Sequence, residues 1–557
     1  MAKQQPPTEV GNVAHELEQA IQKILESTGR RKLIVAGPGA GKTTLFKTLL
    51  KRSPGDKKTR LALTFITNLR DDMEKALGEL CKVSTLHGYC QGLLHTIPDL
   101  RNGLSEHFVC QPGMASLIKE DWQYLHKAEP PEFVKLMRNL HCGEELNFYI
   151  ERANYYDAVD FDDSVYRTAA ELKAHSACVP KYDLVLIDEY QDFNSMEADV
   201  IETLAGTSPI VVAGDDDQAL YSQLRDANWE HIRALHRADE YEVFELPFCM
   251  RCPDVIVQAV RDVIVHARKA KKLEGRIDKS YRHFEPAKGK DSKRYPKIWL
   301  VDTSVQRNNA NYFGRFIAEA IRSIPDEEIK EANEKGEPVV LIIGGIQYRR
   351  PIEAYLVEVG YEIPKVDATP DALSIERGLE LLKNDPESNL GWRIVLRVRK
   401  KGLAIAAVRE AKSKVRLVEC IPKDFRERVL ADAEKFQPEA IEPQDARVDD
   451  KEAQGLTIKL TSFEGAKGLS AQHVFIVGMH TGDLPRDPED IQDLEICKFL
   501  VGLTRTKKRC ALLLTRRFGQ DSKDPSVFLE WINEERFEQI SIDAKYWDKR
   551  CGVSRKT

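Results

Sequence analysis

The chain has 557 residues, of which 42% are hydrophobic and 31% are charged, and its net charge is −6. Because a single hydrophobic core stops growing at about 250–300 residues, a chain of this length should fold into several domains. The acidic balance excludes a protein that coats nucleic acid uniformly, although it leaves room for a local basic track. With no apolar run near the roughly 20 residues that span a bilayer and no signal-peptide core, we expect a cytoplasmic protein without membrane contact.

A glycine-rich turn between a strand and a helix comes early in the chain. Residues 33–36 predict a buried strand, and the stretch 31–44 reads RKLIVAGPGAGKTT. In a phosphate-binding loop, successive backbone N–H groups point at phosphate oxygens from such a turn, and the strand and helix on either side disfavour a turn without a ligand. Lys42 would neutralise the β- and γ-phosphates of ATP, and the Thr43 hydroxyl would bind Mg2+. The nucleotide-binding residues expected here are Gly37, Gly39, Ala40, Gly41, Lys42, Thr43 and Thr44.

Further strands and helices follow in alternation. Residues 61–66 predict a second strand and residues 69–80 a helix, after which 91–178 lack glycine loops and predict a helical insertion. Strands return at 184–188 and 210–213. This alternation predicts a parallel sheet with helices on both faces, in which ligands bind at the carboxyl ends of the strands.

Polar residues stand at the ends of these later strands. Asp188 and Glu189 follow one strand, where the first acid would hold Mg2+ and the second would polarise an attacking water. Gln218 follows the next strand and is placed to sense the γ-phosphate. Hydrolysis also needs positive charge opposite the phosphoryl group, for which Arg251 and Arg505 are candidates, although spacing alone would make each an ordinary surface arginine.

A second group of strands predicts a second α/β domain. Its expected strands are 298–301, 339–343, 458–461, 474–477 and 511–514. Helical sequence and an acidic stretch at 437–452 interrupt this domain, and the polar segment 325–338 predicts a solvated surface connection. Between residues 393 and 416 stand nine Lys or Arg against one acid, a run that on its own most often forms a solvated face.

Together these stretches resemble the motifs of the UvrD, Rep and PcrA group of superfamily 1 helicases. AGPGAGKT is similar to the first motif, LTFITNLRDDM to motif Ia, VSTLHGY to Ib, IDEYQDFN to II and VVAGDDDQALY to III. ELPFCMRCP resembles motif IV, LTSFEGAKGLSAQHVFIVGM motif V and CKFLVGLTRT motif VI. A P-loop kinase or GTPase would leave GDDDQ and AKGL without a role.

The resemblance implies an α/β protein with two RecA-like P-loop domains, each with a mainly helical insertion, and ATP bound between them. The first RecA-like domain would comprise 1–90 and 179–246, and the second 247–365 and 454–557. A 1B-like insertion would span 91–178, and a short 2B-like insertion carrying the basic run would span 366–453.

Residue roles also follow from the resemblance. Lys42 and Thr43 would bind phosphate and Mg2+, Asp188 would hold the metal, and Glu189 would activate water. Gln218 would sense the γ-phosphate, and Arg251 and Arg505 would act as arginine fingers. Gln19 would read the adenine, although the asparagine usual three positions earlier is absent.

A DNA track would run over both motor domains. Stacking on aromatic rings is independent of base sequence, which suits a translocating motor. For Phe65 and Tyr221 core packing is the alternative. The residues expected on the track are Phe65, Thr67, Asn68, Thr85, His87 and Tyr221, with Arg397, Arg399 and Lys400 added from the basic run.

The chain departs from the family pattern at several positions. The aromatic residue expected before Arg225 is absent, and Met250 replaces a tyrosine that stacks on adenine. No phosphate or metal ligand is lost, so ATP hydrolysis should survive. The second insertion is short, and with fewer than 60 residues after Arg505 we expect no fused nuclease domain.

The expected function is an ATP- and Mg2+-dependent translocase that unwinds duplex with 3′-to-5′ polarity. Its partners would be single-stranded or tailed duplex DNA. The alternative is a regulatory DNA- or nucleotide-sensing ATPase subunit in a phage-defence complex of the Gabija type, where a separate subunit would be the nuclease.

Overall fold

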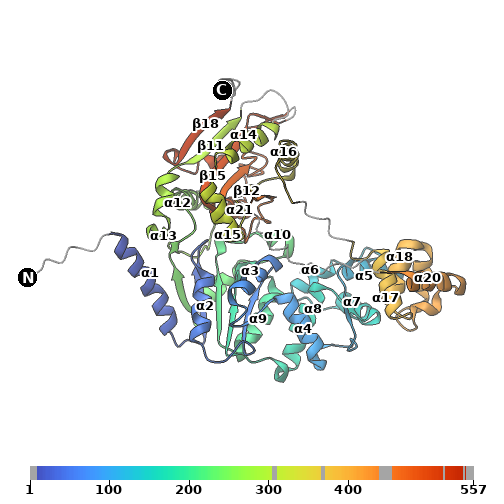
Figure 1. Cartoon of the computed structure of the whole chain (residues 1–557). Helices are drawn as coiled ribbons and strands as arrows, with labels where there is room; N and C mark the ends of the chain where they lie inside the picture. Colours follow the sequence, from blue (N-terminus) through green and yellow to red (C-terminus); the bar gives the residue numbers. More distant parts are fainter. Residues whose placement is uncertain are drawn as a thin grey trace, which may run out of the picture.

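The computed structural model describes residues 9–303, 310–364, 371–437, 455–518, 521–542 and 546. Two α/β domains lie one above the other in Figure 1, and a helical lobe extends from the side of the lower one. Within the described residues no helix is long and apolar enough to cross a membrane. The ten cysteines in this part of the chain are free thiols.

The first domain contains six parallel strands in the order β3-β2-β6-β7-β1-β8. Their bounds are β1 (Arg31–Ala36), β2 (Arg60–Thr64), β3 (Lys82–Thr85), β6 (Leu184–Ile187), β7 (Ile210–Gly214) and β8 (Glu242–Leu246). The four central strands are buried almost throughout, as a parallel sheet covered on both faces requires. The edge strands β3 and β8 are partly exposed and polar, which is why the sequence does not predict them.

Alternate residues of each central strand enter two different cores. In β1, Ile34 and Ala36 pack with α1 (Glu9–Glu26), α2 (Lys42–Arg52) and α3 (Thr67–Leu77). Leu33 and Val35 face the opposite side, which is covered by α4 (Leu86–Thr96), α8 (Phe161–Ala174) and α9 (Ser195–Thr207). Helices therefore cover both faces of the sheet, and its carboxyl edge stays open for the polar loops.

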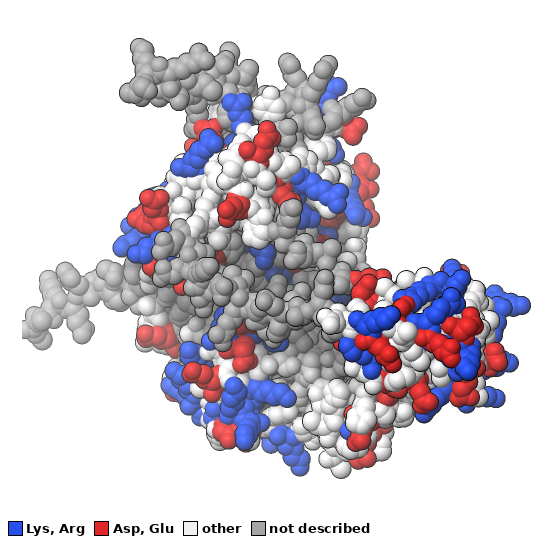
Figure 2. Space-filling view, turned by 45° about the vertical axis from the view of Figure 1, so that its right-hand side comes forward, with Lys and Arg blue, Asp and Glu red and all other residues white. Residues whose placement is uncertain are grey.

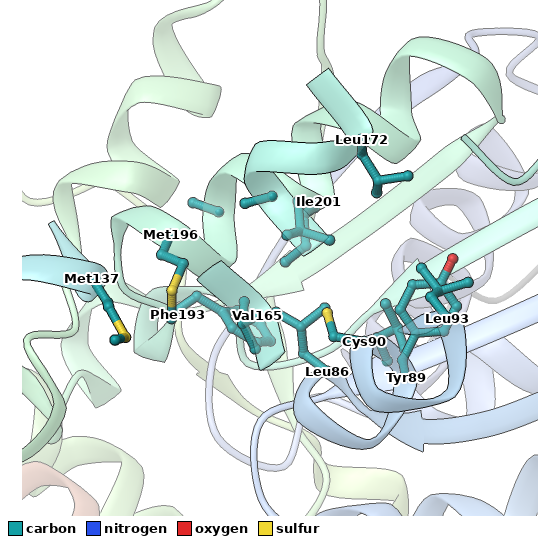
Figure 3. Close-up of a cluster of buried hydrophobic side chains, with 14 of the residues drawn as sticks. Leu86, Tyr89, Cys90, Leu93, Met137, Val165, Leu172, Phe193, Met196 and Ile201 are labelled. Atoms are coloured by element: carbon teal, nitrogen blue, oxygen red, sulfur yellow. The ribbon is translucent and has the colours of Figure 1, made fainter. Parts of the chain in front are cut away.

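The first insertion shares a core with the sheet domain. Figure 3 shows Met137 of α6 (Phe133–Arg138) and Val165 of α8 in one cluster with Leu86 of α4 and Ile201 of α9. The helices α5 (Met114–His126) and α7 (Glu144–Tyr156) extend this cluster outward. The predicted helical character of this region is thus observed, and the insertion is continuous with the first domain in packing.

The second domain has the same architecture, with parallel strands in the order β13-β12-β14-β15-β11-β18. The strands are β11 (Ile298–Thr303), β12 (Val340–Ile343), β13 (Ile458–Thr461), β14 (Ala471–Val477), β15 (Thr506–Thr515) and β18 (Phe537–Ile542). One face carries α12 (Asp254–Lys269) and α21 (Asp493–Thr504), and the other carries α14 (Ala310–Arg322) and α16 (Ile346–Glu358). The expected fold class, two RecA-like α/β domains, is confirmed.

The segment 325–338 is only in part the solvated connection that its composition predicts. It contains α15 (Asp326–Glu334), and its Glu328 is fully buried. Glu328 accepts a hydrogen bond of 2.6 Å from the Tyr295 hydroxyl and lies 2.8 Å from His473 Nε2. The prediction is therefore wrong for Glu328, and Glu331 of this helix lies at the interdomain cleft, whereas the other charged residues of α15 are exposed, namely Asp326, Glu327, Lys330 and Glu334.

The second insertion forms the helical lobe of Figure 1 with α17 (Ile375–Asn384), α18 (Asn389–Arg399), α19 (Lys401–Ala411) and α20 (Lys423–Lys435). It packs on α5 and α7 of the first insertion and stands away from the second sheet. Residues 365–370 and 438–454 lie outside the described part of the chain, and so do the expected ends of this insertion and most of the acidic stretch 437–452.

Candidate nucleotide-binding cleft

The glycine-rich loop joins β1 to α2 at the carboxyl edge of the first sheet, as its sequence predicts. Gly39 and Gly41 have φ angles of 72° and 86°, which side chains rarely adopt. A Cβ at position 39 would lie 2.5 Å from the Cβ of Arg251, and one at position 41 would overlap Cε of Met250. Glycine is therefore needed both for the loop conformation and for the close approach of the second domain's residues.

Lys42 and Glu189 form a buried ion pair in this loop region. Lys42 Nζ lies 2.6 Å from Glu189 Oε1 and 3.8 Å from Asp188 Oδ1. Burial opposes charge on Lys42, but Glu189 and Asp188 outweigh it and hold the Lys42 pKa above its usual range. Burial likewise opposes ionisation of Glu189, yet Lys42 and Lys467 together hold its pKa well below its usual range. Both side chains are charged at neutral pH.

Asp188 has an unused acceptor at the same place. Its Oδ1 atom is buried and has no hydrogen-bond partner, and burial raises the Asp188 pKa to about 6 against the opposing effect of Lys42. Thr43 lies in the first turn of α2 and lines the same cleft. A carboxylate and a hydroxyl are hard oxygen donors of the kind that Mg2+ prefers, so these two residues fit a Mg2+ ion.

Gln218 connects the two domains. Its Oε1 accepts a hydrogen bond of 3.1 Å from Arg505 Nη2, and its Nε2 donates one of 2.8 Å to Asp215 Oδ2. Burial lowers the pKa of Arg505 to about 10, and neighbouring Arg251 acts in the same direction, so Arg505 still carries its charge at neutral pH. Arg251 Nη1 lies 3.4 Å from the Thr504 carbonyl. The sequence-predicted Gln218, Arg251 and Arg505 thus meet at one cleft.

Lys467 is a functional candidate that the sequence reasoning missed. It is 3% exposed, its Nζ donates a 2.6 Å hydrogen bond to the Gln218 carbonyl, and it lies 3.5 Å from Glu189 Oε2. It also contacts the Asp192 carboxylate. The available signal was a single lysine between Ala466 and Gly468 in the quoted AKGL stretch, to which no role was assigned.

Between the domains lies a cavity of about 550 Å³. The glycine-rich loop, Asp188 and Glu189 form one wall, and Met250, Arg251 and Arg505 form the other. Its volume falls in the range of small-ligand and cofactor sites. Cations from the second domain, Lys288, Lys335 and Lys507, also line it. The arrangement can hold a polyanion between a fixed loop and arginines that belong to the opposite domain.

Comparisons with known proteins find relatives for part of the chain. A family model described as UvrD/REP helicase N-terminal domain matches residues 114–239. The probable DNA helicase II homolog of Mycoplasma capricolum subsp. capricolum is 26% identical over 34% of this chain and 32% of its own length. The ATP-dependent DNA helicases UvrD1 of Mycobacterium leprae and Rep of Buchnera aphidicola subsp. Baizongia pistaciae are 25% and 26% identical, over 39% and 36% of this chain.

The chain is UvrD/Rep-like. The resemblance drawn from its motifs is thereby confirmed. The matched stretches span about a third of the length of each of these relatives, 32%, 35% and 36%. The family model covers the strand and loop that carry Asp188, Glu189 and Gln218, so the match includes part of the cleft described above.

In this UvrD/Rep-like protein Gln19 is not at the cleft. It is an exposed residue of α1, and its Nε2 lies 2.9 Å from His15 Nε2 on the same helix. The amphipathic helix buries Leu17 and Ile24 and leaves Gln19 on its outer side. The adenine-reading role expected of Gln19 has no support from its position.

Phe65 does not offer a free ring to DNA in this structure. It is 2% exposed, its ring centroid lies 4.7 Å from that of Tyr221, and the Arg225 guanidinium lies 4.5 Å above its ring. The alternative of core packing therefore holds for Phe65. Tyr221 is half-buried and donates a 3.0 Å hydrogen bond to the Glu464 carbonyl.

The other residues of the expected DNA track differ in exposure. Thr67 and Asn68 are exposed at the start of α3, and Thr85 accepts the Gly88 N–H as the N-cap of α4. His87 is 8% exposed, and burial first, then Arg225, lowers its pKa to about 4, so the ring is neutral at pH 7. Thr67 and Asn68 are the most accessible members of the track.

Four of the nine basic residues of the run form ion pairs among the described residues, namely Arg393, Arg397, Arg399 and Arg416. Arg393 is fully buried with its Nε 2.8 Å from Asp121 Oδ1, and Arg397 Nε lies 2.9 Å from Glu120. Arg399 pairs with Asp432 at 2.6 Å, while Lys400 is exposed. Figure 2 shows both signs of charge interspersed over this lobe. The run therefore joins two insertions, and of the three residues proposed for DNA binding only Lys400 has no ion pair among the described residues.

Proposed function

We propose that this UvrD/Rep-like protein is an ATP- and Mg2+-dependent motor that moves along single-stranded DNA and unwinds duplex. The observation that carries the proposal is the Gln218–Arg505 hydrogen bond, which joins the two domains beside the Lys42–Glu189 pair. A group between these residues would be sensed by both domains at once. The 3′-to-5′ polarity is carried over from the family resemblance.

Bound ATP with Mg2+ would supply a transferable phosphoryl group and a counter-charge. Lys42 would exchange its bond to Glu189 for phosphate oxygens, since the glycine-rich loop holds it at the amino end of α2. Glu189 would then accept a proton from water, and it stays oriented because Gln191 Nε2 donates a 2.6 Å hydrogen bond to its Oε2. Arg505 and Arg251 would face the developing negative charge from the second domain.

Opening and closing of the cleft would be transmitted to bound DNA through the loops that carry Gln218 and Lys467. Tyr221 follows Gln218 by three positions, and its hydroxyl is bonded to the backbone of Glu464, near Lys467. Opening or closing of the cleft would therefore shift the surface around Tyr221, Thr67 and Asn68 between the two domains. Movement of such a surface relative to a bound strand is what translocation requires.

The test is ATP hydrolysis by the purified chain, with and without single-stranded DNA and with and without Mg2+. The same sample is then given duplexes with a 3′ tail or a 5′ tail, and Lys42→Ala serves as the control for contaminating activity. We expect hydrolysis that needs Mg2+, stimulation by DNA, and unwinding of the 3′-tailed duplex alone. Absence of hydrolysis under all conditions would overturn the proposal.

A regulatory ATPase subunit is the second candidate, and one observation favours it. Leu224, which is 61% exposed, occupies the position where the family carries a ring, so stacking on a base is lost there. Stimulation by DNA without unwinding would favour this candidate. The substitution Leu224→Trp then discriminates further, because a motor limited by the missing ring should gain unwinding rate, whereas a sensor should not.

A further inference from the structure

A loop that we call the strap, residues 273–281, lies against the carboxyl end of β7. At one end, the Leu273 N–H donates a 2.9 Å hydrogen bond to Asp493 of α21 in the second domain. At the other, the Tyr281 hydroxyl lies 3.3 Å from the Pro38 carbonyl in the phosphate-binding loop. In between, Ile277 is buried in the core of the first domain, and its N–H donates to Asp216. The strap is thus tied to both domains.

Three consecutive aspartates at the end of β7 contact the strap. Asp215, Asp216 and Asp217 are 1%, 3% and 6% exposed, and one oxygen of each lies 2.7, 2.6 and 3.0 Å from Lys279 Nζ. These carboxylates stand close enough together to hold a metal ion, but the Lys279 ammonium already lies among them. Arg276 makes two bonds to Asp217, at 2.6 and 2.7 Å.

The charges in this cluster balance. Arg233 of α11 (Glu230–Arg237) pairs with Asp216 at 2.9 Å, so three cations face three carboxylates. A buried carboxylate without such partners is costly, and a buried cluster that is fully paired is held in one arrangement. The position of the Asp215 side chain is therefore set by Lys279 together with the Asp217 N–H, which donates a 3.1 Å hydrogen bond to Asp215 Oδ1.

Asp215 in turn fixes the orientation of the Gln218 side chain. Asp215 Oδ1 faces Lys279, while its Oδ2 accepts the Gln218 amide at 2.8 Å. An amide side chain has a donating and an accepting end, so fixing its NH2 group on Asp215 directs its oxygen elsewhere. That oxygen accepts from Arg505, at 3.1 Å. A continuous chain of polar contacts runs from Lys279 through Asp215 and Gln218 to Arg505.

We propose that Lys279 is a positioning residue for ATP hydrolysis, which orients Gln218 through Asp215. The inference rests on the proposed ATPase function. Lys279 lies outside the stretches that resemble family motifs, and it does not line the cleft. It acts on the phosphate-sensing amide and on the arginine that this amide contacts. Loss of Lys279 leaves the phosphate and metal ligands in place and removes the fixed orientation of Gln218.

Asp215→Asn and Asp217→Asn form the matched pair for the test. Both aspartates are buried and contact Lys279, but of these two side chains the structure shows a hydrogen bond to the Gln218 amide for Asp215 and none for Asp217. We expect Asp215→Asn to lower kcat for ATP hydrolysis by about 10–100-fold with KM nearly unchanged, as for residues that orient a catalytic group. Asp217→Asn should keep kcat within about twofold, because its loss does not reach Gln218.

Lys279 itself is tested by Lys279→Met and Lys279→Arg. Lys279→Met should reproduce the kcat loss of Asp215→Asn, and Lys279→Arg should restore part of it. Because Lys279→Met removes the cation that faces three buried carboxylates, it can prevent folding, and the aspartate pair decides the test where this variant does not fold. In a Gln218→Ala background, Asp215→Asn should cause no further loss, since both act through one amide.

The outcomes separate this inference from the function on which it rests. Equal kcat for Asp215→Asn, Asp217→Asn and the wild type, in a protein that hydrolyses ATP, would overturn the role of Lys279 alone. A further loss from Asp215→Asn in the Gln218→Ala background would also overturn it, because Asp215 would then act elsewhere. A wild-type protein that does not hydrolyse ATP would overturn both.

Discussion

The nucleotide cleft and the joint between the two insertions both bury opposite charges, and they differ in how completely their buried aspartates are hydrogen-bonded. The joint comprises Glu120, Asp121, Arg152, Tyr156 and Arg393. Asp121 Oδ1 accepts from Arg393 at 2.8 Å, and its Oδ2 accepts from Arg152 at 2.6 Å and from the Tyr156 hydroxyl at 2.5 Å. In the cleft, Asp188 Oδ1 is equally buried and has no hydrogen bond.

This difference in hydrogen bonding shows which buried charged residues can bind a ligand. Both oxygens of Asp121 already accept hydrogen bonds from side chains, which leaves little capacity for a metal ion. Asp188 retains that capacity, and Lys42 can leave Glu189 because Lys467 and Gln191 remain beside that carboxylate. Burial and charge are common to both places. An unused acceptor and exchangeable partners distinguish the cleft.

The largest effect should come from removing the central cation of the cleft. Lys42→Ala is expected to lower kcat for ATP hydrolysis by about 10³-fold or more, the scale reported for removing positive charge from phosphoryl-transfer sites. Lys47→Ala is the matched control, because Lys47 is an exposed lysine of the same helix. Steady-state hydrolysis with saturating DNA measures both variants. A Lys42→Ala enzyme with wild-type kcat would refute the assignment of the cleft.

Substitutions in the joint should lower the free energy of unfolding and leave ATP hydrolysis unchanged. Arg393→Met removes one partner of the fully buried Asp121 and is expected to cost about 3–5 kcal/mol of unfolding free energy in the lobe. Arg399→Met breaks the exposed pair with Asp432 and should cost less than about 1 kcal/mol. Denaturant unfolding followed by circular dichroism compares them, and DNA-independent ATP hydrolysis serves as the control. Equal stabilities would mean that the lobe is not held by this joint.

The sequence predicts the site residues that directly follow apolar strands. Lys42, Asp188 and Gln218 each follow a short apolar strand, and parallel strands bring such ends to one edge, so their meeting could be predicted. Arg251 and Arg505 came from the family resemblance, and the structure places both at the cleft. The edge strands β3, β8 and β18 escaped prediction because their partly exposed, polar residues lack the apolar signal of central strands.

The sequence does not predict contacts between side chains that lie far apart in the chain. Arg393 and Asp121 are 272 residues apart in the chain, and Glu328 and His473 are 145 apart, so the neighbouring sequence does not predict these contacts. Arg393 and Glu328 are therefore buried in stretches whose composition predicts solvated faces. Phe65 was expected to face DNA because the residues that cover it, Tyr221 and Arg225, follow by more than 150 positions. Lys467 was overlooked for the same reason.

The pH dependence of the unfolding free energy tests whether His87, an expected member of the DNA track, is buried. The pKa of His87 is about 4 in the folded protein against an ordinary 6.5, first because of burial and then because of Arg225. Between these values the unfolded chain binds more protons, so stability falls as the pH drops, by about 3 kcal/mol at pH 4 from this group. His87→Gln should lose less stability than the wild type between pH 6.5 and 4.

The measurement is the difference in unfolding free energy between wild type and His87→Gln at each pH. Glu197 lies 3.6 Å from His87, and burial raises its pKa to about 7, so it titrates in the same window with the opposite sign. It is present in both proteins, so the difference isolates His87 to first order. A difference that does not change with pH would show that His87 is solvated and open to DNA.

The smallest effect tests whether the lobe carries any of the DNA track. Lys400 is exposed and has no ion pair among the described residues, whereas Arg397 is bonded to Glu120. A lysine that contacts phosphate releases a counterion, so Lys400→Ala should reduce the slope of log K against log salt by about 0.7 for single-stranded DNA. Arg397→Ala should leave the slope nearly unchanged, since its charge is already neutralised. If neither variant changes the slope, the expected contributions of Lys400 and Arg397 to the DNA track are both wrong.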